Sequence, residues 1–185
     1  MKTKDYKNSD LIKKITFAAV CLALSFVLPF ATGAIPEIGG MLCPMHIPAF
    51  FAGALLGPWL GGIVAFVSPL LRGLIFGAPI LFPRGVSMAF ELLAYAVCFG
   101  LLLKLLPRKL PYVYLSLTGA MLVGRTIGGI TKLVLLTSGS IQSYGWTLFF
   151  TGYFIETIPG VAVQFVLIPA VLYALDRAKI YSYGE

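Results

Sequence analysis

The feature that most constrains the fold is a series of apolar segments, most of them long enough to cross a lipid bilayer. One transmembrane helix needs about 20 mainly apolar residues. Only 11% of the 185 residues are charged, against roughly 25% in soluble domains. The apolar runs are continuous rather than alternating, which disfavours a β-barrel. We therefore predict an all-α membrane protein, one integral membrane domain over residues 1–185, whose six-transmembrane-helix bundle has spans at about 11–31, 47–56, 60–76, 86–106, 112–136 and 146–175.

Most basic residues fall at three places: the N-terminal segment, the connection between the fourth and fifth spans, and the C-terminal tail. They are Lys2, Lys4, Lys7, Lys13, Lys14, Lys104, Arg108, Lys109, Arg177 and Lys179. An excess of Lys and Arg marks the cytoplasmic side of a membrane protein, and six spans place all three regions on one side. We expect both termini to be cytoplasmic, so that Ser140, in the 137–144 loop, is outside. The net charge of +7 then reflects topology rather than nucleic-acid binding.

The single histidine, His46, lies between two prolines in the stretch Met41–Pro48. Proline fixes its own φ and favours extended geometry in the residue before it. We therefore expect this stretch to be non-helical and the next helix to begin only at about Pro48. A rigid lip at the mouth of an apolar bundle suits a ligand, which makes Met45 and His46 candidate contacts. The alternative is a plain boundary between a loop and a helix.

Ionisable residues inside or beside the apolar spans are a second indication of a site. Such groups cost several kcal/mol at the bilayer centre unless they are paired or hydrated. They are Arg72, Arg84, Glu91, Arg125, Lys132 and Glu156. Arg84, Met88, Glu91 and Tyr95 recur at helical spacing and so share a helix face.

Two further spans carry a comparable polar face. In the last span it comprises Tyr153, Glu156, Gly160 and Gln164, and in the fifth span Arg125 and Lys132 flank Gly128 and Gly129. Converging faces predict an outward-open polar cavity. Its candidate substrate-binding residues are His46, Met45, Arg84, Glu91, Tyr95, Arg125 and Glu156. The alternative is that pairs such as Glu91–Arg125 only fix helix packing.

The first span carries small residues instead of charges, because Thr16, Ala19 and Ala23 are spaced by three and four. Such stripes allow another helix to approach closely, either from a partner protein or from within the bundle. The three cysteines have no C-x-x-C spacing, and with a single histidine they exclude a structural zinc site. We expect no metal in this chain.

Together these residues resemble the substrate-binding S components of energy-coupling factor (ECF) vitamin transporters. The resemblance covers nearly the whole chain and rests on the six spans, on Ala19–Ala23, on Leu42–Pro48, and on Ser68–Arg72, Phe82-Pro83 and Phe90–Leu92. It implies high-affinity binding and translocation of a water-soluble vitamin or vitamin precursor. Cobalamin precursors, pantothenate and pyridoxine-type compounds are the expected range.

The resemblance also implies partners. In that family a small-residue motif in the first span docks the transmembrane T subunit, and two ATPase subunits supply the energy. The chain has no G-x-x-x-x-G-K-[ST] loop, so we expect ATP hydrolysis by the partners and no cofactor here. A multi-pass protein of a prokaryotic cell membrane is expected.

Two other functions deserve comparison. An autonomous secondary transporter or channel often contains inverted repeats, and none is visible here. A membrane-embedded enzyme needs a nucleophile, base or metal constellation, and the sequence has no H-E-x-x-H, G-x-S-x-G or paired Asp motif. We therefore predict that the protein is not an enzyme.

Overall fold

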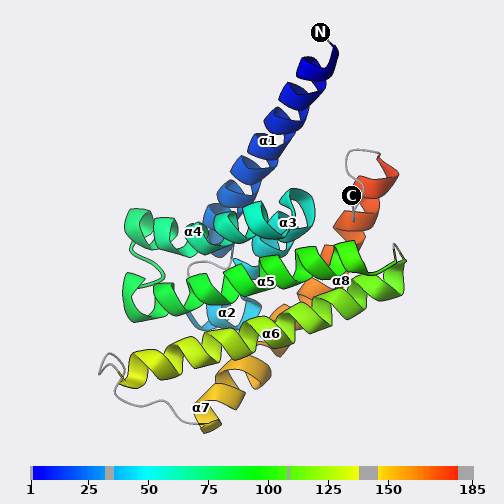
Figure 1. The fold of residues 1–185 in the computed structure, drawn as a ribbon. Helices are drawn as coiled ribbons and strands as arrows, with labels where there is room; N and C mark the ends of the chain where they lie inside the picture. Colours follow the sequence, from blue (N-terminus) through cyan, green and yellow to red (C-terminus); the bar gives the residue numbers. More distant parts are fainter. Residues whose placement is uncertain (1, 32–35, 108, 138–145, 179–185) are drawn as a thin grey trace.

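The computed structural model describes residues 2–31, 36–107, 109–137 and 146–178, and within these ranges the chain is helical without any strand (Figure 1). Two short π-helical segments, η1 and η2, interrupt the α-helices. In chain order the elements are α1 (Lys2–Ala31), α2 (Pro36–Leu42), α3 (His46–Leu56), α4 (Pro58–Phe76), η1 (Leu81–Gly85), α5 (Val86–Leu105), α6 (Leu110–Thr137), α7 (Trp146–Phe150), η2 (Thr151–Ile155) and α8 (Ile158–Arg177).

Six helical segments are long and apolar enough to cross a membrane, which confirms the predicted six-span fold. They are Asp10–Ala31, Gly39–Leu56, Pro58–Phe76, Leu81–Leu105, Leu110–Leu135 and Thr151–Arg177. The predicted loop around Ser140 lies outside the described residues.

The prediction that the chain stays non-helical until Pro48 is wrong. Residues Pro36–Leu42 form α2, and α3 already begins at His46, so that only Cys43–Met45 separate the two helices. The first turn of a helix has backbone N–H groups without an intrahelical acceptor, so a proline there sacrifices no hydrogen bond. Pro36 starts α2 and Pro48 is the third residue of α3, which is why neither proline prevents helix formation.

The last span is not the continuous helix predicted over 146–175. α7 and η2 are followed by a turn at Glu156 and Thr157, after which α8 begins with a proline in its first turn. Pro159 has no N–H to donate to an upstream carbonyl, so a helix entering from η2 cannot continue through it unchanged. The break places Glu156 at a turn rather than on a helix face.

Backbone contacts hold α3, α4 and α5 together at the centre of the bundle. A Cβ atom at Gly53 of α3 would collide with the backbone of Ala96 on α5, and one at Gly61 of α4 with the backbone of Ala52. Gly100 of α5 faces the Gly53 carbonyl in the same way. These glycines permit the close approach that aligns α4 and α5 side by side in Figure 1.

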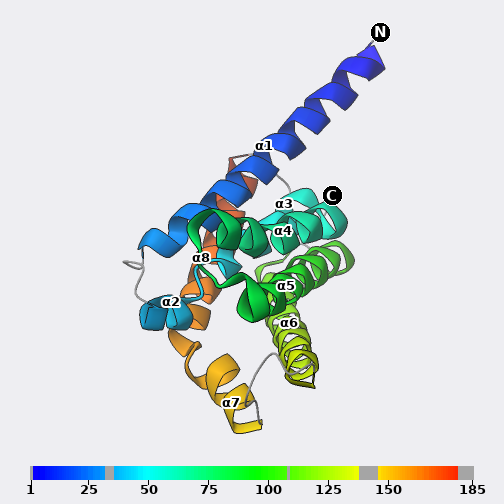
Figure 2. The same ribbon diagram turned by 90° about the vertical axis from the view of Figure 1, so that its left-hand side faces the viewer.

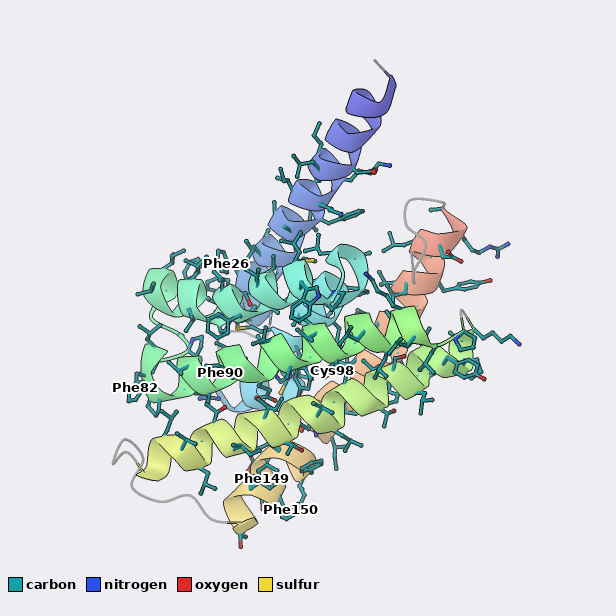
Figure 3. All side chains as sticks on the ribbon, viewed as in Figure 1. Phe26, Phe82, Phe90, Cys98, Phe149 and Phe150 are labelled. Atoms are coloured by element: carbon teal, nitrogen blue, oxygen red, sulfur yellow. The ribbon has the colours of Figure 1, made fainter. Side chains whose placement is uncertain are left out.

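The remaining helices pack around this centre. α6 lies along α5, and α8 packs against α2, because Gly160 leaves room for the carbonyl groups of Met41 and Leu42. α1 leans across α3 and α4 and projects away from the bundle at its N-terminal end (Figures 1 and 2). α7 lies beyond α6, and Figure 3 shows Phe149 and Phe150 there.

Candidate functional site

A cavity of about 130 Å³ opens where α2, the first turn of α3, η1, α5, α6 and η2 meet. Its lining combines backbone from two glycine-containing segments with charged and polar side chains. The lining residues are Gly39, Gly40, Cys43, His46, Arg84, Ser87, Met88, Glu91, Lys132, Gly152, Tyr153 and Thr157. The faces predicted on the fourth, fifth and last spans each contribute at least one residue to this lining.

His46 is the first residue of α3 and is 5% exposed. Its Nε2 atom has no hydrogen-bond partner and lies 3.8 Å from Glu91 Oε1. That separation is too long for a hydrogen bond. The imidazole packs edge-on against the Tyr95 ring, with 5.0 Å between the ring centroids, so its orientation is fixed while one nitrogen faces the cavity wall.

Glu91 of α5 is buried and has one hydrogen bond within its own helix. The Tyr95 hydroxyl, one turn further on, donates to Glu91 Oε1 over 2.8 Å. The other carboxylate oxygen faces Gly128 of α6, where a Cβ atom would lie 3.0 Å from Oε2 and 2.9 Å from the Tyr153 hydroxyl oxygen. The predicted glycine notch in the fifth span therefore makes room for the Glu91 carboxylate and the Tyr153 hydroxyl.

Arg125 of α6 is also buried, with 6% of its surface exposed, but it does not line the cavity. Its guanidinium carbon lies 5.3 Å from the centroid of the Phe154 ring. The predicted Glu91–Arg125 ion pair is not formed within 4.0 Å: the ionisable side chain at that distance from Glu91 is His46. The Tyr95 side chain accounts for this separation. Its ring packs against Gly124 of α6, next to Arg125, and so fills the space between α5 and α6 at that level.

Two cations line the cavity, one from η1 and one from α6. Arg84 belongs to η1 and is exposed, whereas Lys132 of α6 is partly buried, with its Nζ atom 4.3 Å from the centroid of the Tyr153 ring. An ammonium over an aromatic face is attracted by the ring quadrupole. The cavity therefore presents a positive rim around the deeper carboxylate of Glu91.

The other residues that the sequence singled out for the site lie outside the cavity lining. Tyr95 and Arg125 form a layer behind Glu91, Met45 belongs to the hydrophobic core, and Glu156 is exposed outside the lining. Arg72 lies away from the cavity, donates to the Ala78 carbonyl, and has its guanidinium carbon 5.4 Å from the Phe30 ring centroid. It stabilises the connection from α4 to η1.

Several lining residues were not predicted as ligand contacts. Lys132, Met88 and Tyr153 were predicted only as members of the polar faces of their spans. Cys43 adopts a positive φ of 47° while its thiol donates to the Gly40 carbonyl over 3.0 Å. This left-handed backbone is uncommon outside glycine, and no sequence signal for it was available.

On α1, the small residues Thr16, Ala19 and Ala23 all lie on the exposed side of the helix. The Thr16 hydroxyl donates to the Ile12 carbonyl over 2.9 Å, so it is satisfied within the helix. The alternative that this stripe packs inside the bundle is therefore wrong. The opposite side of α1 faces the core through Cys21 and Ser25, both buried.

The arrangement suits reversible binding of a small polar molecule. Within the described residues there is no cluster of three or more His, Cys, Asp or Glu side chains that could hold a metal ion. Charged groups of both signs, Arg84, Glu91 and Lys132, line a cavity in a bundle that has six helices long and apolar enough to cross a membrane. Fold and site together define a multi-pass membrane protein with a small, charged binding cavity.

A comparison with known families identifies the family to which this membrane protein belongs. The model of the family "ECF transporter, substrate-specific component" matches residues 13–172. The chain therefore belongs to the family of substrate-specific components of ECF transporters, an integral membrane transport component and not an enzyme. The searches of curated proteins and of solved structures gave no match.

Proposed function

We propose that the protein binds a water-soluble vitamin or vitamin precursor with high affinity and carries it across the membrane as the S component of an ECF-type ABC importer. The observation that carries this proposal is the cavity around His46, Glu91 and Lys132. Ligand sites in proteins are concave and combine apolar walls with a few placed polar groups, and this cavity has that composition.

The exposed small-residue stripe of α1 supports a separate docking face for a partner. Ala19 and Ala23 lie on the exposed side of a helix that the rest of the chain leaves largely uncovered. Small side chains let a second transmembrane helix approach closely. We infer that this face meets the transmembrane T subunit, and that two ATPase subunits complete the importer and hydrolyse the ATP.

The assignment as an S component also predicts how the protein is oriented in the membrane. The α5–α6 connection and the C-terminal end of α8 lie on one side of the molecule, opposite the α4–η1 connection (Figure 1). The basic residues belong to the former side, which we infer to be cytoplasmic. The cavity, which η1 and η2 help to form, would then face outward.

Cysteine accessibility in intact cells tests this orientation. Ala78, in the α4–η1 connection, and Lys109, in the α5–α6 connection, are both exposed, so each can be replaced by Cys in a background without native cysteines. We expect an impermeant maleimide to label Ala78→Cys directly and Lys109→Cys only after permeabilisation. The reverse pattern would contradict the orientation.

Reconstitution tests the function itself. The protein should be co-purified with a T subunit and two ATPases, and the complex in liposomes should accumulate vitamin only when ATP is supplied on the ATPase side. Transport by the isolated protein without these subunits would instead favour an autonomous transporter or channel.

A further inference from the structure

The connection between α4 and η1 lies largely on the surface of the protein. Gly77, Ala78 and Ile80 are exposed, and so are Leu81 and Phe82 at the start of η1. An exposed segment with few buried apolar contacts opens at a low free-energy cost. The contacts that do hold this connection therefore decide how firmly it is placed.

Arg72 of α4 provides one of these contacts and is itself buried. Its guanidinium donates to the Ala78 carbonyl, six residues further along the chain. The next residue of α4, Gly73, lets the connection fold back onto the helix, because a Cβ there would lie 2.8 Å from the Pro79 carbonyl oxygen. A hydrogen bond from a charged donor is stronger than a neutral one. Arg72 thus ties the connection to the end of α4.

The same guanidinium reaches α1. Its central carbon lies 5.4 Å from the ring centroid of Phe30 on α1 and 5.8 Å from that of Phe76 at the end of α4. A cation close to an aromatic ring is attracted by the ring quadrupole. The planar guanidinium of arginine can pack on a ring while it donates hydrogen bonds. One side chain, Arg72, therefore joins α1, α4 and the connection.

The attachment at Ala78 continues into the cavity wall. Two residues further on, the Ile80 carbonyl accepts a 2.8 Å hydrogen bond from the Gly85 backbone N–H. Arg84, next to Gly85, lines the cavity, and its carbonyl accepts a hydrogen bond from the hydroxyl of Ser87, another lining residue, over 3.0 Å. A displacement of the connection away from α4 would therefore move the η1 border of the cavity.

We propose that Arg72 is a positioning residue that fastens the η1 border of the cavity to α4 and α1 and so limits access to the cavity. The inference rests on the proposed function of this cavity as the ligand site, and it names the contact that controls how a ligand enters and leaves. Arg72 lies outside the cavity lining, so it acts through η1 and not by touching the ligand.

Cys43 is a native reporter of access, because it lines the cavity and is only 9% exposed. In a background with Cys21→Ala and Cys98→Ala, the rate at which N-ethylmaleimide labels Cys43 reports how often the cavity opens. Arg72→Gln keeps a polar side chain but removes the guanidinium. This variant should raise the labelling rate about tenfold or more, the effect of losing one hydrogen bond from a charged group. An unchanged rate would overturn the proposal.

Labelling of Cys98 separates local opening from a general loosening of the fold. Cys98 is half-buried on α5 and lies outside the cavity lining. In a protein that keeps only this cysteine, Arg72→Gln should leave the labelling rate unchanged. Equal acceleration at Cys43 and Cys98 would mean that Arg72 supports the whole bundle, and it would contradict the assignment.

Arg177→Gln is the matched control, because it removes another guanidinium beside an aromatic ring. The central carbon of Arg177 lies 5.9 Å from the Tyr173 ring centroid, and Arg177 is the last, exposed residue of α8. Cys43 should react at the wild-type rate in this variant. Acceleration by the same factor as in Arg72→Gln would overturn the proposal.

Phe30→Leu tests the contribution of α1. It removes the ring from beside Arg72 and leaves the hydrogen bond to Ala78, so that labelling of Cys43 should accelerate, but by less than in Arg72→Gln. No acceleration would contradict the link to α1.

The inference and the proposed function can fail separately, because these labelling rates require neither ligand nor partner. Equal Cys43 rates in the wild type and in Arg72→Gln would overturn the role of Arg72 even if ATP-dependent vitamin uptake with the T subunit and ATPases is observed. Faster labelling in Arg72→Gln without such uptake would reject the proposed function and support the role of Arg72.

Discussion

α1 and α3 are both apolar helices of the membrane domain, yet they occupy opposite environments. In the span Gly39–Leu56, 72% of the residues are buried inside the protein, against 11% in an 18-residue stretch of Asp10–Ala31. Hydropathy does not separate them, because lipid and a protein interior accept the same side chains. The difference lies in where small residues face: Gly53 of α3 contacts backbone of α5, whereas Ala19 and Ala23 of α1 face outward.

The largest effect on stability is expected at Gly53. Gly53→Leu should prevent correct folding or cost more than about 3 kcal/mol, because the new side chain meets the Ala96 backbone, which cannot rotate away. Thermal unfolding in detergent measures this. Gly40→Ala is the control, since a Cβ there has no atom within 4 Å. Similar losses of stability in Gly53→Leu and Gly40→Ala would mean that packing at Gly53 is no tighter than packing at Gly40.

Arg125→Ala is expected to cost about 3 kcal/mol, because it removes a buried guanidinium that hydrogen-bonds Tyr95 and acts electrostatically on the Glu91 carboxylate. Combining it with Glu91→Gln should recover part of that loss, since the neutral amide no longer needs a counter-charge. Arg177→Ala, at the exposed end of α8, is the control. Strict additivity of the two changes would mean that Arg125 and Glu91 do not interact.

If the double variant regains stability but still binds the transported ligand poorly, Glu91 or Arg125 contributes to the ligand site. If stability and affinity return together, the two residues act only as a structural pair, and the site reduces to His46, Arg84 and Lys132.

Tyr95→Phe should have a smaller effect, about 1.5–3 kcal/mol, because it removes the 2.8 Å hydrogen bond to the Glu91 carboxylate and leaves the packing intact. Phe99→Tyr is an instructive comparison, because it adds a hydroxyl to a fully buried ring of the same helix. An unchanged unfolding midpoint in Tyr95→Phe would mean that the hydrogen bond does not hold the carboxylate.

The smallest effect on stability is expected on α1. Ala19→Trp and Ala23→Trp should change the unfolding free energy by less than about 0.5 kcal/mol and leave ligand binding nearly intact, yet abolish uptake, because the bulky ring blocks close approach by a partner helix. Ala19→Ser and Ala23→Ser keep the residues small and serve as controls. Loss of ligand binding together with uptake would place this face inside the functional bundle.

Most of the fold could be predicted because bilayer thickness and apolar run length leave few alternatives. The spans at 60–76, 86–106 and 112–136 agree with α4, α5 and α6 to within two residues at each end. α2 was missed because its proline and two glycines suggest a loop, although a proline in the first turn is compatible with a helix. The break after η2 had a signal in Pro159, but periodicity outweighed it.

The sequence predicted which residues of one helix lie together in the site, but not which residues of different helices meet there. Helical spacing correctly grouped Arg84, Met88 and Glu91, and all three line the cavity. Spacing carries no information about which faces of α5 and α6 meet, so Arg125 was expected beside Glu91, where the structure has His46 instead. Lys132 and Cys43 became recognisable as lining residues only in three dimensions.

The glycine contacts among α3, α4 and α5 have a mechanical consequence. Where one helix backbone touches another, no side chain lies between them whose rotamer could change to let the helices slide, and shear between packed helices depends on such small adjustments. These three helices should therefore move through the lipid as one rigid unit. Flexing has to take place at its edges, where α1 leans on it and where η2 borders the cavity.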